Sequence, residues 1–173
     1  MRGKKRKYRR VVRKTVLIYC EGGSECAFLA YLNEIYYQRG GDFILTIENG
    51  QGGSPDILVK KTKESEGYDR KYVWLDVDRP EIGKARKIAE KAKIFLFENE
   101  PLHLEGELLR MLGCNIKGVS DYKRKFIQLY PNHDLCDKRT YKKLLPKEKI
   151  ELIRESEEFV IGRIIKLLET GEL

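Results

Sequence analysis

Acidic residues follow two short apolar runs of the sequence. Residues 15–20 (TVLIYC) end at Glu21 and two glycines, and residues 71–75 (KYVWL) run directly into an Asp-x-Asp motif at Asp76 and Asp78. These two aspartates are two positions apart, so both side chains point to the same side if strand geometry persists. Clustered carboxylates cannot all stay ionised alone, and a hard divalent cation relieves the conflict because it prefers oxygen ligands. The pattern predicts a catalytic metal site of Glu21, Asp76 and Asp78 for Mg²⁺ or Mn²⁺.

Both apolar runs are predicted to be buried strands of one sheet. Further strands are predicted over 43–47 and 94–97, and helices are predicted to start near Ser24, Ser54 and Pro80. This alternation favours an α/β fold, with a Rossmann-like, mostly parallel sheet of about four strands and helices on both faces. Functional groups gather at the carboxyl ends of such strands, so the three acids should converge there.

The last third of the chain is predicted to be helical. After Pro101 the apolar residues recur at helical spacing, as at Tyr122 and Phe126, and one long final helix is predicted after Pro146. We therefore expect a single domain over 15–173, which suits 173 residues that are 41% hydrophobic.

The net charge of +8 is concentrated in residues 1–14. Nine of the 35 Lys and Arg residues lie there without any acid, which leaves 26 basic against 27 acidic residues in the remaining chain. The residues expected to bind nucleic acid are Lys4, Lys5, Arg6, Lys7, Arg9, Arg10, Arg13 and Lys14. Basic arms bind polyanions because each neutralised phosphate releases counterions, so DNA or RNA is the expected partner. A solubilising tail would have the same composition.

Other features indicate a cytoplasmic protein without a membrane partner. No apolar stretch approaches the ~20 residues that a membrane span needs, and the basic N-terminus lacks the apolar core of a signal peptide. The four cysteines form no C-x-x-C pair and are expected to be reduced thiols.

Several motifs together resemble one protein family. They are Cys20 to Glu25 (CEGGSE) before a helix, Gly53 to Pro55 (GSP), Tyr68 with Asp69, and Trp74 to Asp78 (WLDVD). Over roughly residues 13–113 the chain is similar to the RloB-like proteins, a Toprim-fold group associated with bacterial defence and restriction loci and related to the overcoming-lysogenization-defect nucleases.

This resemblance implies roles for individual residues. It implies that Glu21 is a general acid/base or metal ligand, that Asp76 and Asp78 bind metal, and that Glu25 supports the site. Such proteins also carry an Asn-Pro-x-x-Glu-like segment, which here has altered spacing between Asn99 and Glu105. The roles of Asn99 and Glu105 therefore stay open. A defence-system partner protein is a further implication.

Two functions are compatible with these patterns. The first is a Mg²⁺-dependent nuclease in which Glu21 manages a proton, with His103 at the same sheet edge positioning a phosphate or relaying a proton. The second is a non-catalytic nucleic-acid-binding or assembly subunit that retains a Toprim metal site. For His103, a surface or capping role also fits the sequence.

Overall fold

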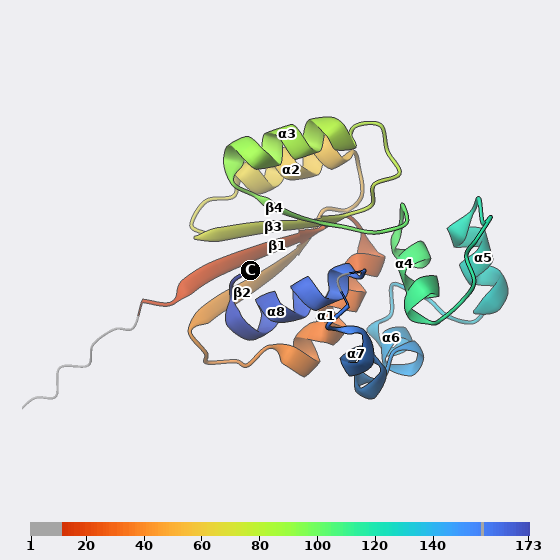
Figure 1. Ribbon diagram of the computed structural model, residues 1–173. Helices are drawn as coiled ribbons and strands as arrows, with labels where there is room; N and C mark the ends of the chain where they lie inside the picture. The colour runs from red at the N-terminus through yellow and green to blue at the C-terminus, as the bar shows by residue number, and fades with distance from the viewer. Residues whose placement is uncertain (1–11, 157) are drawn as a thin grey trace, which may run out of the picture.

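The computed structural model describes residues 12–156 and 158–173, which form a parallel sheet with helices on both faces (Figure 1). The strands of this part of the chain are β1 (Lys14–Cys20), β2 (Phe43–Asn49), β3 (Arg70–Leu75) and β4 (Phe95–Glu98). They are all parallel in the order β2-β1-β3-β4. The predicted α/β class and the parallel sheet of about four strands are confirmed.

Burial on both faces explains why residues 16–20 of β1 and 72–75 of β3 are apolar. Along β1, Val16 and Ile18 belong to one core cluster, whereas Leu17 and Tyr19 belong to another on the opposite face. The helices α1 (Gly23–Tyr36) and α8 (Val160–Thr170) cover the first face, and α2 (Pro55–Glu64) and α3 (Ile82–Ala92) cover the second (Figure 1). A central parallel strand covered in this way needs apolar side chains at successive positions.

Shorter helices follow β4 along the chain, and the first two of them lie beyond the carboxyl ends of the strands (Figure 1). They are α4 (Leu104–Met111), α5 (Tyr122–Leu129), α6 (Lys138–Leu144) and α7 (Lys147–Ile153). The connection to α4 is held against the sheet, since the amide of Val77 donates to the carbonyl of Leu102 at 2.8 Å. The expected helical C-terminal part is confirmed.

The prediction of one long final helix is wrong. The chain turns between α7 and α8, and the amide of Val160 at the start of α8 donates to the buried carboxylate of Glu107 at 2.9 Å. Gly162 permits this turn, because a Cβ there would lie 2.1 Å from the carbonyl oxygen of Arg154. Tertiary contacts therefore break a continuous helical pattern into two helices.

The described helices bear on the membrane prediction. None of those within 12–156 and 158–173 combines the length and the apolar character that crossing a bilayer requires.

Candidate metal centre

The ends of β1 and β3 place Glu21 beside Asp76. These strands are neighbours in the sheet, with Cys20 opposite Trp74, and the amide of Glu21 donates to the carbonyl of Trp74 at 2.9 Å. The Glu21 carboxylate in turn accepts a hydrogen bond from the backbone amide of Asp76 at 3.0 Å. The expected convergence of the two acidic motifs at one sheet edge is therefore seen.

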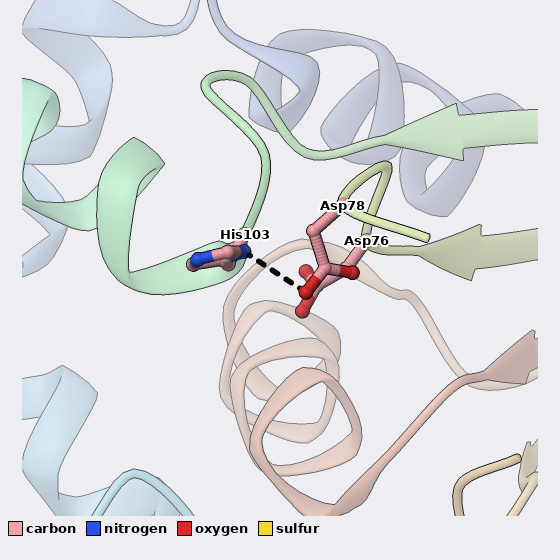
Figure 2. Close-up of side chains that lie close together, drawn as sticks. All are labelled: Asp76, Asp78 and His103. Carbon is pink, nitrogen blue, oxygen red and sulfur yellow. Dashed lines mark ion pairs between the residues drawn. The ribbon is translucent and has the colours of Figure 1, made fainter. Parts of the chain in front are cut away.

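Asp76, Asp78 and His103 form the tightest group of possible metal ligands in the described residues (Figure 2). One ligand atom from each lies within 4.8 Å of the others. Asp76 is buried and Asp78 is exposed, so the group spans the boundary between core and solvent. The Nδ1 atom of His103 lies 3.6 Å from Oδ2 of Asp78, and Figure 2 shows the imidazole reaching toward the aspartates from the start of α4.

His103 carries a buried polar atom that lacks a partner. Its Nδ1 is buried and accepts or donates no hydrogen bond within the described part of the chain. Buried polar atoms usually have a hydrogen-bond partner, and this nitrogen lies next to two carboxylates, so it is placed to act as a ligand. A cation shared with Asp76 and Asp78 would satisfy it.

A buried hydrogen-bond relay fixes the orientation of Asp76. The indole Nε1 of Trp74 donates to Oδ1 of Asn99 at 2.7 Å, and Nδ2 of Asn99 donates to Oδ1 of Asp76 at 2.7 Å. The amide of Leu104 donates to the same carboxylate oxygen at 3.0 Å. Asn99, whose role the sequence left open, therefore supports Asp76, and Trp74 is both core and part of the relay.

Four acidic residues surround a hollow of about 180 Å³ next to this group. Its charged lining residues come from the ends of β1 and β3 and from α1, α4 and α5, and they are Glu21, Asp76, Glu25, Glu105 and Lys123. Asp76 belongs both to the hollow and to the group with Asp78 and His103. Nothing in the local sequence pattern around Lys123 ties α5 to the sheet edge, so its place in the hollow could not be predicted.

The first turn of α1 brings Glu25 into the hollow. The helix begins at Gly23 after the N-cap Gly22, one residue before the predicted start near Ser24. The Glu25 carboxylate accepts a hydrogen bond from the amide of Gly22 at 3.2 Å and performs part of the capping. A Cβ on Gly22 would lie 3.3 Å from the Glu25 carboxylate, so a glycine suits this close approach.

Burial raises the pKa values of the acids around the hollow. It is the main cause of the raised pKa of Glu21, Asp76 and Glu105. Burial, and then the negative charge of Asp76, raises the pKa of Glu25 to about 7. The hydrogen bond from Asn99 and the charge of Lys123 oppose the shift at Asp76 without cancelling it. The acids of the hollow are therefore protonated more readily than exposed carboxyl groups.

The predicted nucleic-acid-binding residues are only partly described. Lys4, Lys5, Arg6, Lys7, Arg9 and Arg10 lie outside the described residues. Arg13 and Lys14 are exposed, and Lys14 is the first residue of β1, where its ammonium group pairs with Glu172. Lys14 therefore belongs to the sheet, whereas sequence reasoning assigned it to the arm.

No protein-family model, curated protein or solved structure matches this chain.

Proposed function

We propose that this chain is a metal-dependent enzyme that cleaves phosphodiester bonds in nucleic acid, of the Toprim type that the sequence resemblance implies. The observation that carries the proposal is the group of Asp76, Asp78 and His103, whose ligand atoms lie within 4.8 Å of one another. It stands at the carboxyl ends of parallel strands, where open α/β sheets bind their ligands.

The donor set fits a divalent cation. Asp76 and Asp78 offer the carboxylate oxygens that Mg²⁺ and Mn²⁺ prefer, and His103 offers a buried nitrogen that lacks a partner in the described residues. The relay through Asn99 resembles the outer hydrogen bonds that orient ligating carboxylates in metal sites. When bound, such a cation supplies positive charge to the phosphate and lowers the pKa of water.

The acids of the hollow are suited to proton transfer. Glu21 lies beside Asp76 and its pKa is raised mainly by burial, while Glu25 has a pKa of about 7. A general base works best when its pKa lies near the working pH. We infer that Glu21, with Glu25 next to it, takes the proton from the attacking water, and that the ammonium group of Lys123 helps to hold the phosphate.

The substrate class is proposed to be DNA or RNA. A hollow lined by four carboxylates repels a polyanion until cations occupy it, and a basic N-terminal arm offsets that repulsion. The cytoplasmic location and a defence-system partner protein stay predictions.

Cleavage assays test this proposal directly. Single- and double-stranded DNA and RNA are incubated with the full chain in Mg²⁺, in Mn²⁺ and with a chelator, and metal binding is titrated separately. We expect at least one substrate to be cut only when metal is present. If the chain binds metal and nucleic acid but cuts nothing in either metal, the binding or assembly subunit is the better description.

Truncation of the arm tests the nucleic-acid part of the proposal. Removing residues 2–11 deletes seven basic residues and leaves Arg13 and Lys14 in place. Affinity for a duplex should fall, and the slope of log K against log salt should flatten by about 0.9 for each phosphate that the shortened chain no longer neutralises. An unchanged slope would show that the arm is only a solubilising tail.

A further inference from the structure

Two cysteines enclose the first acidic motif of the site. Cys20 is the last residue of β1 and is fully buried, and Cys26 lies in the first turn of α1 and is half-buried. The five residues between them include Glu21 and Glu25. The site's first motif, which joins the end of β1 to the first turn of α1, therefore has a thiol at each end.

Cys20 and Cys26 lie on the same side of the sheet. Cys20 belongs to the core cluster between the sheet and α1, and Cys26 packs against the same cluster from the first turn of α1. The Cys26 sulfur also lies 3.8 Å from the carbonyl oxygen of Glu48, the residue before Asn49, which pairs with Cys20. This contact places the Cys26 sulfur over the end of β2, directly beside the end of β1 that carries Cys20.

The other two cysteines differ from this pair. Cys114 has its sulfur 3.7 Å from the hydroxyl of Tyr130, and the Cys136 sulfur lies 3.8 Å from the hydroxyl of Ser24. All four cysteines are free thiols in the structure. Cys114 and Cys136 therefore provide internal controls for thiol chemistry.

We propose that Cys20 and Cys26 form a reversible disulfide that disables the acidic site. The chemistry of the pair stands by itself, whereas its effect on activity rests on the proposed function. Hydrogen peroxide or a small-molecule disulfide serves as the oxidant. Cys26 is the thiol that such an oxidant reaches, because Cys20 is completely covered.

With hydrogen peroxide, the reaction has two steps. The Cys26 sulfur attacks one peroxide oxygen, the O–O bond breaks, and a sulfenic acid and one water form. The Cys20 sulfur then attacks the Cys26 sulfur, the S–O bond breaks, and the disulfide and a second water form. Both sulfurs are oxidised and the peroxide is reduced, and a dithiol reductant reverses the change.

Bond formation must move the start of α1 rather than the sheet. Cys20 pairs with Asn49 on one side and with Trp74 on the other, so the end of β1 is held between two strands. A disulfide brings its sulfurs to about 2 Å, closer than two thiols in contact. The first turn of α1 takes up the difference, and the adjacent Glu25 carboxylate moves with it.

Peptide mapping tests the bond itself. Trypsin releases residues 15–39 as one peptide that contains both Cys20 and Cys26, while Cys114 and Cys136 lie in other peptides. After mild peroxide treatment and alkylation, we expect peptide 15–39 to lose two hydrogen atoms and to resist the alkylating reagent. Dithiothreitol should restore both thiols, and Cys26→Ser should abolish the change while Cys136→Ser should keep it. Alkylation of both thiols in the treated protein would overturn the proposal.

Two further readouts test the consequence of the bond. Oxidation should weaken Mn²⁺ binding by at least about tenfold, like the removal of an outer hydrogen bond at a metal site. It should also change amide hydrogen exchange over residues 21–25, which is measured without metal. If the disulfide forms but hydrogen exchange over residues 21–25 does not change, the proposal that the disulfide alters the site is refuted. If the reduced chain binds no Mn²⁺, the proposed function is refuted instead. Hydrogen exchange alone would then test whether the disulfide alters residues 21–25.

Discussion

Asp56 and Asp76 are both buried aspartates. Asp56 is paired with positively charged side chains, whereas the groups that bond to Asp76 are uncharged. Asp56, in the first turn of α2, lies 2.7 Å from the ammonium group of Lys84 and 3.1 Å from that of Lys60. The hydrogen bond with Lys84, followed by one from Ser54, lowers its pKa. Asp76 receives hydrogen bonds from the neutral groups of Asn99 and Leu104, and burial raises its pKa.

The difference separates a structural carboxylate from one that is prepared for a ligand. Asp56 has its counter-charges built into the fold, and the packing of α2 against α3 includes one of them. Asp76 is oriented by uncharged donors and stands among other acids. A buried charge without a paired cation is costly, so it is retained where something positive binds.

Replacing Asp76 with Asn should give the largest effect. The exchange keeps the side-chain shape but removes the charge, so metal binding and cleavage should fall by more than about 100-fold, since removal of an outer partner alone costs about 10- to 100-fold. The matched variant Asp56→Asn should lower the melting temperature and leave metal affinity unchanged. Equal metal affinity in wild type and Asp76→Asn would remove Asp76 from the metal centre.

Replacing Asn99 with Ala should give an intermediate effect. The variant removes the donor to Asp76 and leaves the indole of Trp74 without its acceptor, so metal affinity should drop by about 10- to 100-fold. Isothermal titration with Mn²⁺ measures the drop, and the Ser54→Ala variant, which removes a donor to Asp56, serves as control. Full affinity in Asn99→Ala would mean that the relay only stabilises the fold.

The pH dependence of metal binding should follow Glu25. Its carboxyl group is protonated below its pKa of about 7 in the metal-free chain, and cations favour the ionised form. Metal affinity should therefore fall by up to about tenfold for each pH unit below 7, with proton uptake when the metal leaves. Titrations between pH 5.5 and about 8 should show a flatter profile for Glu25→Gln. The same slope in both proteins would exclude Glu25 as the titrating group.

Glu107 should make the free energy of unfolding depend on pH without affecting the metal centre. It is almost fully buried, one of its oxygens accepts the amide of Val160, and burial raises its pKa to about 8. Because the folded pKa exceeds the unfolded value, the folded state binds more protons, and stability should fall as pH rises from about 5 to 8. The decrease is at most about 1.4 kcal/mol per pH unit.

Denaturant unfolding of the Glu107→Gln variant checks this assignment. Its free energy of unfolding should lose that part of the pH dependence, while its metal affinity should match that of the wild type. A decline with pH as steep as in the wild type would place the effect at other groups, such as the acids of the hollow.

The sequence by itself determined the sheet and its acidic edge. Residues 16–20 and 72–75 are apolar at successive positions, as strands covered on both faces require, and the acids follow at the point where each strand ends. Parallel pairing then brings Glu21 to the backbone of Asp76. These features are local patterns joined by one topological rule, so they can be predicted.

Only the tertiary structure decided which other residues complete the site. The altered spacing between Asn99 and Glu105 hid the role of Asn99, which appears once its amide is seen between Trp74 and Asp76. Lys123 reaches the hollow from α5, far along the chain, and the break between α7 and α8 depends on the Glu107 carboxylate. Such interactions join side chains whose sequence positions are unrelated, and no local periodicity encodes them, because packing between layers determines which side chains meet.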